Sequence, residues 1–396
     1  MKYNFDEIID RSNTYSSKWD SDVQKELFGK ADLLPYWVAD MEFKTAPEVI
    51  DTLKKRVEHG IFGYSNRNDD YYNSIINWTN KRFDYQLEKE WILYSPGVVP
   101  AVNYVIQAFS NEGEGVIINE PVYYPFKRSI EANDRVVVNS NLILKDNMYY
   151  MDFEDLEEKI RDPKNKILIL CSPHNPVSRV WTKEELSRVG DLCYENDVLV
   201  LADEIHNDLI LKGNTHTMFA SLGKKYQDIS ITATAPSKTF NLAGLYSSNI
   251  IVPNKDLRVR LETVFLRNSI GGQSPLSIEG VIAAYNKGED WLDSLLEYLN
   301  KNVKFIEDFL LKNLPKAKLI EVQSTYLAWI DFREYEKDGN KLEKLIIEKA
   351  GCALDGGTWF GQGGSGFMRF NVAAPKEFIS LGLERIASAI NEEYEK

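Results

Sequence analysis

The middle of the chain alternates short apolar runs with segments of helical periodicity, and this alternation restricts the folds that the sequence can adopt. Several runs are β-branched throughout, which is typical of strands covered on both faces. Between two of them, Thr182 and Glu185 form a capping-box pattern that predicts the start of a helix. Strands that alternate with helices predict a mainly parallel α/β sheet. The expected strands are residues 91–94, 115–119, 136–139, 167–171, 198–202, 229–232 and 248–252.

The pattern changes after about residue 275. Residues 277–314 read as largely helical, with turn chemistry around residues 287–290. The elements expected after them are strands at 318–322 and 326–331, a helix at 341–349, a strand at 367–371 and a final helix from 376. This α+β pattern indicates a smaller second domain, against which the loop-rich first 45 residues should pack. We predict a large domain over residues 46–285 and a small domain made of residues 1–45 and 286–396.

Composition excludes several classes of function. The chain has 47 Lys and Arg against 60 Asp and Glu, and the net charge of −13 argues against nonspecific binding to nucleic acid or anionic membrane. The N-terminus lacks the apolar stretch of a signal peptide, and no segment approaches the ~20 apolar residues of a membrane span. The widely spaced Cys171, Cys193 and Cys352 suit a reducing cytoplasm, and the four His form no metal-ligand pattern. We expect a cytoplasmic protein that acts on a small molecule without a metal.

Two charged residues follow expected strands, at the sheet edge where open α/β folds bind ligands. Lys238 lies among small and hydroxyl residues after the strand at 229–232. An isolated loop lysine is usually a solvated surface charge, but almost no other charge lies near this one in the sequence. Asp203 ends the apolar run at 198–202, where a carboxylate could equally cap a helix. Both residues are therefore candidates for ligand binding.

Uncharged groups follow two further strands. Asn175 lies in a Ser-Pro-His-Asn-Pro stretch after residues 167–171, and the plain interpretation is a turn. Gly97, with Val98 and Val99, follows residues 91–94 and opens a helical pattern, so its neighbouring N–H groups could bind an anion. Most strand–glycine–helix junctions bind nothing. The hydroxyl of Ser237 could reach the same anion.

An aromatic and a basic residue complete the candidates. Tyr123 follows the strand at 115–119; such a residue is more often part of the core, and the alternative is a ring stacked on a flat ligand. Arg369 alternates with apolar neighbours on the strand at 367–371. A strand arginine usually faces solvent, but an inward guanidinium would bind a carboxylate bidentately.

These groups match the requirements of pyridoxal phosphate (PLP). The cofactor needs an amine, an anion opposite its pyridinium nitrogen, a donor to its phenolic oxygen and a phosphate cradle. Lys238, Asp203 and Asn175 supply the first three, and the segment that begins at Gly97 supplies the fourth. Each signal is modest alone. Their shared place at the ends of strands predicts a PLP enzyme in which Lys238 holds the cofactor as a Schiff base.

The chain also resembles the fold-type I PLP enzymes of the class I/II aminotransferase superfamily, over roughly residues 30–390. Within that superfamily it is most similar to the MalY/PatB branch of cystathionine β-lyases, or C–S lyases. The motifs that carry the resemblance are Trp37-Val-Ala-Asp-Met-Glu-Phe43, Gly60-Ile-Phe-Gly-Tyr-Ser65, Pro96-Gly-Val-Val-Pro100, Pro173-His-Asn-Pro-Val177, Ala202-Asp-Glu-Ile-His-Asn-Asp208, Ser237-Lys-Thr-Phe-Asn-Leu-Ala-Gly244 and Phe367-Met-Arg-Phe-Asn371.

Two positions separate the chain from aminotransferases. They usually have Tyr where His206 stands and commonly a phosphate-binding Arg near Tyr246, and this sequence has neither. The family often has Gly where Ser178 stands, so that turn departs from the pattern. Without the Arg, phosphate binding should depend on Ser237, backbone amides and a partner subunit.

The resemblance implies a role for each candidate. Lys238 would hold the cofactor and later act as the base, Arg369 would bind the substrate carboxylate, and Tyr64 would reach the phosphate of a neighbouring subunit in an obligate homodimer. Trp37 and Asp40 would lie near the substrate mouth, with core and cap as their plain alternatives. The remaining implied cofactor contacts are Asp203 to the pyridinium, Asn175 to the phenolic oxygen, Tyr123 stacked on the ring, His206, Ser237, Gly97, Val98 and Val99.

The implied reaction is α,β-elimination of cystathionine- or cysteine-type amino acids to pyruvate, ammonia and a thiol. One alternative is an aminotransferase of the same fold, which would need a keto-acid acceptor. Another is a regulatory or partner-binding protein that retains the fold. The sequence leaves open which β-substituted amino acid is the physiological substrate.

Overall fold

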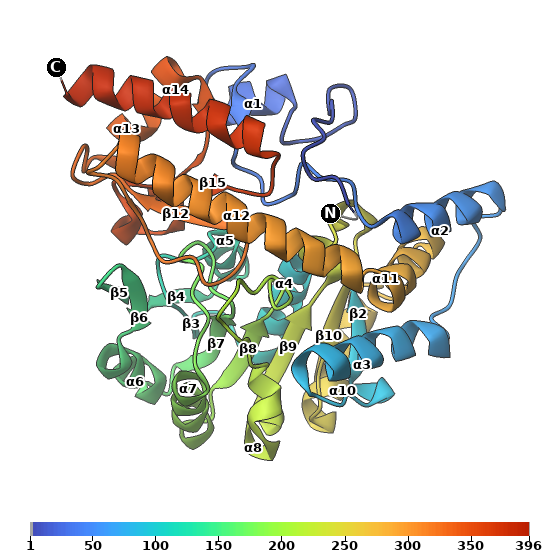
Figure 1. Ribbon diagram of the computed structural model, residues 1–396. Helices are drawn as coiled ribbons and strands as arrows, with labels where there is room; N and C mark the ends of the chain where they lie inside the picture. The colour runs from blue at the N-terminus through green and yellow to red at the C-terminus, as the bar shows by residue number, and fades with distance from the viewer. Residues whose placement is uncertain (1–2, 396) are drawn as a thin grey trace.

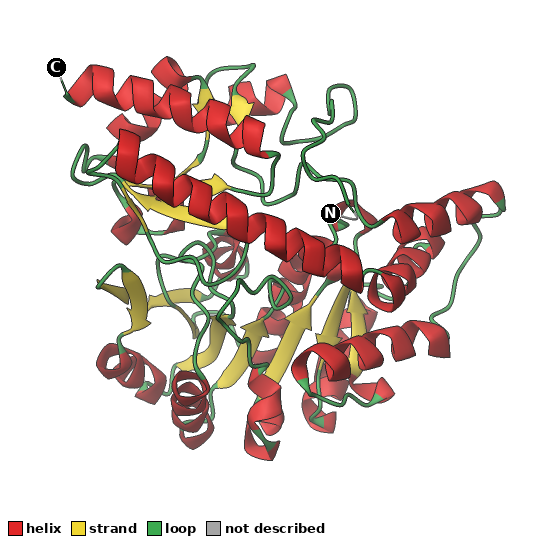
Figure 2. Cartoon of the chain, viewed as in Figure 1, coloured by secondary structure: helices red, strands yellow, loops and turns green. Residues whose placement is uncertain are grey.

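A seven-stranded sheet forms the centre of the computed structural model, which describes residues 3–395 (Figures 1 and 2). Its order is β2-β10-β9-β8-β7-β3-β4. The central pairs are parallel, and β10 is antiparallel to both of its neighbours. The strands are β2 (Ile92–Ser95), β3 (Gly115–Ile118), β4 (Val136–Asn139), β7 (Asn165–Cys171), β8 (Leu199–Asp203), β9 (Ser230–Thr234) and β10 (Ser248–Ile251). The predicted α/β sheet is confirmed, and each expected strand is present with small shifts at its ends.

Helices cover both faces of this sheet, which explains why its strands are apolar throughout (Figure 2). On β7, Ile167 and Ile169 pack on one face, while Leu168 packs on the other. The capping box of Thr182 and Glu185 is present at the start of α7. One face is covered by α4 (Val98–Phe109), α5 (Pro125–Ala132) and α10 (Lys255–Arg267). The other is covered by α6 (Phe153–Arg161), α7 (Lys183–Glu195) and α8 (Lys224–Asp228).

A second, antiparallel sheet has the order β11-β12-β15-β14. The predicted break near residue 288 is confirmed, because one helix ends at Lys287 and the next begins at Glu289. The predicted helix at 341–349 is α13 (Gly339–Leu345) followed by a π-helical turn (Ile346–Ala350). The other elements here are α11 (Pro275–Lys287), α12 (Glu289–Asn313), β11 (Lys318–Leu319), β12 (Leu327–Asp331), β14 (Asp355–Gly356), β15 (Phe367–Asn371) and α14 (Lys376–Tyr394).

The N-terminal segment lies against this second sheet, as expected (Figure 1). Residues 34–43, which we call the strap, begin with β1 (Leu34–Pro35), which pairs in parallel with β13 (Cys352–Ala353). The Asn371 side chain then donates to the carbonyl oxygens of Val38 and Asp40, both at 2.7 Å. The strap is therefore fixed to β15 through its main chain.

The remaining elements are helices near the N-terminus and a hairpin beside the large sheet. The hairpin was not predicted; its turn residues Asp146 and Asn147 both have positive φ (49° and 63°), as in the tight turns that suit twisted strands. The elements are α1 (Ser21–Phe28), α2 (Pro47–Glu58), α3 (Asp69–Phe83), β5 (Leu142–Lys145), β6 (Met148–Met151) and α9 (Pro236–Thr239). Within residues 3–395, no helix is both long and apolar enough to cross a membrane.

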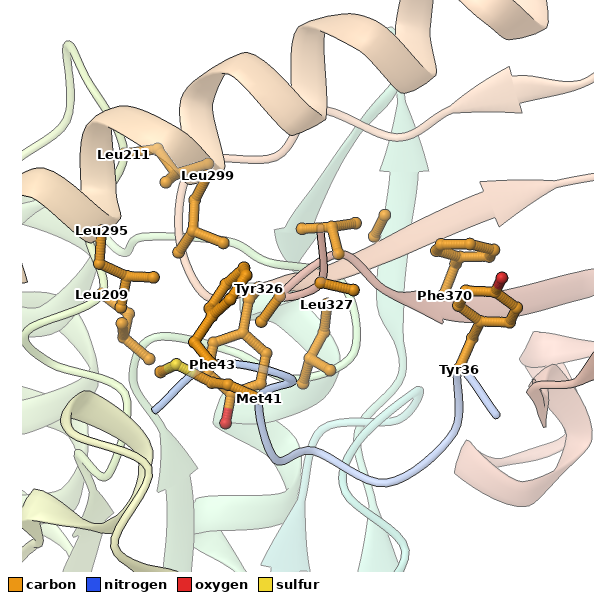
Figure 3. Packing of buried hydrophobic residues seen from close by; sticks show 14 of the residues in the cluster. Tyr36, Met41, Phe43, Leu209, Leu211, Leu295, Leu299, Tyr326, Leu327 and Phe370 are labelled. Carbon is orange, nitrogen blue, oxygen red and sulfur yellow. The ribbon is translucent and has the colours of Figure 1, made fainter. Parts of the chain in front are cut away.

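One apolar cluster joins the two sheets (Figure 3). It brings Met41 and Phe43 of the strap together with Leu209 after β8, Leu299 of α12 and Leu327 of β12. Residues from both sides of the predicted domain boundaries, at 45/46 and 285/286, contribute to this cluster. The two boundaries stay predictions. The cluster holds the strap over the ends of β8 and β9, where the candidate site lies.

Candidate active site

A cavity of about 450 Å³ opens at the carboxyl ends of the central strands. Cys171 ends β7 and Asp203 ends β8, and both line the cavity with Ala235, the residue after β9. This is the edge at which open α/β sheets bind ligands. The sequence-predicted residues that the structure brings together on its wall are Gly97, Val98, Val99, Tyr123, Asn175, Asp203, His206, Ser237 and Lys238.

Lys238 presents a half-buried amine to this cavity from α9. Burial lowers its pKa to about 8, although the Asp40 and Asp203 carboxylates act in the opposite direction. Its Nζ donates a hydrogen bond to the Ala39 carbonyl oxygen at 2.7 Å. Such an amine is partly neutral near physiological pH and can therefore act as a nucleophile or a base.

Asp203 lies on the same wall, and it is buried. Burial raises its pKa to about 7, while a hydrogen bond from the Ile205 N–H (3.2 Å) and the charge of Lys238 lower it. A buried carboxylate with so little compensation favours a cationic ligand group. The pyridinium nitrogen of PLP is a group of this kind.

The first turn of α4 offers a place for an anion. Its N-cap residue is Gly97, and no side chain caps the helix. Because the N–H groups of a first helical turn have no partner within the helix, those of Val98 and Val99 can bind a ligand. Ser237 lines the same cavity. A phosphate group fits this end of the site.

Asn175 connects the cavity to Arg369 on β15. Arg369 Nη1 donates to Asn175 Oδ1 at 3.0 Å, and its Nη2 donates to the Trp37 carbonyl oxygen at 2.9 Å. Arg369 is buried and forms an ion pair with buried Asp355. The guanidinium does not line the cavity itself but lies one hydrogen bond behind Asn175, and its Nε has no partner among the described residues.

Tyr123 and His206 contribute two rings to the wall. The Tyr123 ring meets Phe126 edge-on, with centroids 5.6 Å apart, and burial raises the pKa of its hydroxyl. Burial holds the pKa of His206 well below its ordinary value, with a further contribution from Lys238, so its imidazole is neutral. His206 Nδ1 is buried and has no hydrogen-bond partner within residues 3–395.

Three predicted residues lie away from the cavity. The Trp37 side chain is buried against Phe28, with ring centroids 5.4 Å apart. Trp37 is therefore a core residue, which was the plain alternative to a place near the substrate mouth. Asp40 is paired with Arg11 at 2.7 Å and Lys18 at 3.3 Å. Tyr64 is fully exposed and lines a separate polar cavity of about 770 Å³.

Sequence reasoning missed two residues that bear on the site. Ala39 accepts hydrogen bonds through its carbonyl oxygen from Lys238 Nζ and from Tyr326 OH (2.9 Å), and no side-chain pattern signals a main-chain acceptor. Asp355 lies opposite Arg369 in the β14–β15 register. A prediction of β14 would have paired them, but that strand has only two residues. In the described part of the chain, no group of three or more His, Cys, Asp or Glu residues could hold a metal ion.

The chain is similar to known proteins over nearly all of its length. Residues 38–386 match the model of the family "Aminotransferase class I and II". Cystathionine beta-lyase PatB of Bacillus subtilis is 42% identical over 98% of this chain and 100% of the relative; Protein MalY of Escherichia coli is 35% identical over 98% and 99%. The crystal structure of cystalysin from Treponema denticola, which contains pyridoxal 5'-phosphate, matches with a TM-score of 0.95 and 39% identity over 99% and 100% of the two chains. The predicted fold-type I architecture is thus confirmed.

Proposed function

This chain belongs to the class I and II aminotransferase family, in the branch that contains PatB and MalY, and we propose that it is a PLP-dependent carbon–sulfur β-lyase. Its substrates are amino acids that carry sulfur on Cβ, and its products are pyruvate, ammonia and a thiol. The observation that carries the proposal is the cavity in which Lys238, Asp203 and Asn175 meet, in a chain 42% identical to a cystathionine β-lyase.

Each group of the cavity has a counterpart on the cofactor. When bound, PLP supplies an aldehyde for the substrate amino group and a cationic ring that stores the electron pair left at Cα. The Asp203 carboxylate would pair with the ring nitrogen, and the Asn175 amide would donate to the phenolic oxygen. The phosphate would be bound by the N–H groups of Val98 and Val99 and by the Ser237 hydroxyl. The Tyr123 ring would stack on the cofactor, and neutral His206 would lie beside it.

The protein's own groups then orient the substrate and move its proton. Arg369 would bind the α-carboxylate of a substrate that reaches past Asn175, and its Nε, which has no partner among the described residues, is the nitrogen left for it. Lys238 removes the Cα proton, for which its depressed pKa suits it near neutral pH. The electron pair from the C–H bond then expels the thiolate from Cβ. The three-carbon product is hydrolysed to pyruvate and ammonia after release.

The direct test is an assay of PLP-loaded protein with cystathionine and no keto acid. We expect pyruvate and thiol to appear in equal amounts. Lys238→Ala should abolish both the turnover and the absorbance of the lysine-bound cofactor, whereas Lys224→Ala, which removes an exposed lysine of α8, should change neither. A strict need for a keto-acid acceptor would instead identify an aminotransferase.

We also infer that the protein is a homodimer in which Tyr64 completes the neighbouring site. The inference is supported by the exposure of Ile61, Phe62 and Tyr64 in a segment without regular secondary structure, since large exposed apolar side chains favour a partner. Tyr246, on the rim of the Lys238 cavity, is also exposed. A cytoplasmic location is supported by three buried, unpaired cysteines.

A further inference from the structure

The guanidinium of Arg369 offers fewer open N–H groups than its proposed role requires. Its Nη2 donates to the Trp37 carbonyl oxygen at 2.9 Å and to Asp355 Oδ2, so both hydrogens of this nitrogen are in use. Its Nη1 donates to Asn175 Oδ1 at 3.0 Å, and its Nε has no partner among the described residues. A carboxylate binds bidentately to two parallel N–H groups, and both guanidinium edges that offer such a pair include Nη2. Bidentate binding of a substrate therefore requires that Nη2 release one of its two acceptors.

Asp355 is the acceptor that can be released. The Trp37 carbonyl belongs to the strap, whose main chain is fixed to β15 by the side chain of Asn371. Asp355 is bound through its side chain instead, and its second oxygen, Oδ1, is buried with no hydrogen-bond partner in the part of the chain that the structure describes. The β14–β15 register places this carboxylate opposite Arg369. Its ionised form therefore depends mainly on one guanidinium.

The charges around Asp355 leave it close to taking up a proton. Burial raises its pKa to about 6, while the charge and the hydrogen bond of Arg369 and the charge of Lys18 lower it. A second carboxylate lies beside it, because a Cβ on Gly356 would collide with Glu343 of α13. Burial and the charge of Asp355 raise the pKa of Glu343 to about 7. The other titratable groups that interact with Asp355 are the hydroxyls of Tyr123 and Tyr124, whose pKa values are raised mainly by burial.

We propose that Asp355 competes with the substrate for Arg369: it holds Nη2 while the site is empty and releases it, taking a proton from solvent, when the α-carboxylate binds. Two carboxylates that share one guanidinium away from water cannot both stay ionised. Substrate binding therefore takes up one proton and weakens as the pH rises. This inference rests on the proposed β-lyase function, in which Arg369 binds the substrate, and it makes Asp355 a positioning residue that sets substrate affinity through Arg369.

Binding of a carboxylate without an amine to the PLP-loaded protein tests the competition. The probe is 3-(methylthio)propionate, which has the carboxylate and the thioether of S-methylcysteine but cannot react with the cofactor aldehyde. Calorimetric titrations in two buffers of different ionisation enthalpy measure the protons taken up. At pH 8 we expect about one proton per molecule bound, and Kd should rise about tenfold between pH 7 and pH 8. The uncharged 3-(methylthio)propanamide should bind without proton uptake.

Two variants assign the proton to Asp355. Asp355→Asn retains the shape and an oxygen acceptor without the charge, so at pH 8 it should bind the probe without proton uptake and about tenfold more tightly than the wild type. Asp331→Asn is the matched control, because Asp331 of β12 also pairs with an arginine, Arg333, at 2.7 Å, and it should behave as the wild type. The wild-type titration needs no substitution, so it tests the proposal even if Asp355→Asn fails to fold.

The outcomes separate this inference from the function on which it rests. If the wild-type protein releases no pyruvate from cystathionine without a keto acid, the β-lyase function fails. If it releases pyruvate but binds the probe without proton uptake, or if the uptake persists in Asp355→Asn, Asp355 is no competitor and this inference is wrong. Weaker binding by Asp355→Asn at pH 8 would likewise show that Asp355 supports Arg369. Uptake of one proton that is lost only in Asp355→Asn supports the inference.

Discussion

Burial lowers the pKa of Lys238 to about 8, so its amine changes from the charged to the neutral, nucleophilic form near physiological pH. Only the neutral amine can attack the cofactor aldehyde. About a tenth of the Lys238 amine is neutral at pH 7, and almost all of it is neutral above pH 9. The rate constant for PLP uptake by cofactor-free protein should therefore rise about tenfold per pH unit and level off above pH 8.

Stopped-flow absorbance on cofactor-free protein measures this profile. Asp40 raises the pKa of Lys238, so Asp40→Asn should move the midpoint to lower pH. Asp134→Asn, an exposed site away from the cavity, should leave it in place. A rate independent of pH between 6 and 9 would contradict the assignment of Lys238 as the attacking amine.

Asp203 should make the cofactor-free protein less stable as pH rises. Its pKa is about 7 in the folded protein and near 3.8 in an unfolded chain, so the folded state binds more protons between these values. The contribution of protonated Asp203 to the stability of the folded protein is therefore present below pH 4 and is lost as the pH rises through 7. Asp203→Asn removes the buried charge and should raise the unfolding free energy at pH 8 by about 1–2 kcal/mol.

Thermal unfolding with and without PLP tests this expectation. At pH 8 the cofactor-free Asp203→Asn protein should have the higher Tm, and PLP should raise its Tm less than that of the wild type because the pyridinium loses its partner. Near pH 4.5 the two cofactor-free proteins should differ little. A lower Tm for the cofactor-free variant at pH 8 would show that the carboxylate stabilises the fold.

At the scale of elements, the sequence predicted what depends on periodicity. Strands such as β7 and β8 are covered on both faces, so their apolar runs are unbroken and visible. The helix start at Thr182 is likewise a local pattern. Asp203 and Lys238 could be found because Asp203 ends β8 and Lys238 comes shortly after β9.

The elements that the sequence did not predict depend on contacts between distant segments. β1 and β13 have two residues each and exist because they pair with one another. The site acceptor at Ala39 is a carbonyl that the strap carries to Lys238. Trp37 has a side chain typical of a binding site, yet the direction of the strap places it in the core beside Phe28. No local pattern encodes these placements.

The packing of α14 on the strap gives a prediction at this scale. A Cβ at Gly382 would lie 2.5 Å from the Tyr36 ring, which cannot retreat because it is buried, stacks on Phe370 at 4.4 Å and donates to the Phe378 carbonyl oxygen (Figure 3). Helix propensity favours Ala over Gly by about 1 kcal/mol, but overpacking costs about 1–3 kcal/mol. Gly382→Ala should therefore destabilise the protein.

Urea unfolding should show a lower midpoint for Gly382→Ala. Ser388→Ala, at an exposed position of the same helix, serves as the control and should be neutral or slightly stabilising. Because the strap also carries Ala39 and the carbonyl bound by Arg369, we expect KM to rise with kcat less affected. An increase in stability would mean that Tyr36 can move aside.

At the scale of the whole molecule, the site draws on every part of the chain. Ala39 comes from the strap, Asp203 from β8 of the large sheet, Lys238 from α9 and Arg369 from β15 of the second sheet. Tyr64 is the exception: it lines a different cavity of the same chain and is fully exposed. If it contributes to catalysis, it must do so across an interface.

A mixed dimer tests whether Tyr64 of one subunit serves Lys238 of the other. Lys238→Ala and Tyr64→Ala proteins should each be nearly inactive alone. In a heterodimer of the two, one site contains both wild-type residues and the other contains neither. Random mixing makes half of the dimers mixed, so co-expression should restore about a quarter of the wild-type activity.

The measurement is pyruvate release from co-expressed, differently tagged chains after purification through both tags. The pure heterodimer should then reach about half of the wild-type activity, since one of its two sites is intact. Mixing Lys238→Ala with Asp203→Ala is the matched control, because both changes affect residues of one chain's cavity and each mixed dimer then contains two damaged sites. Equal activity in the two mixtures would place Tyr64 outside the site of the partner subunit. Recovery confined to the Tyr64 mixture would define the dimer as the smallest active form of the protein.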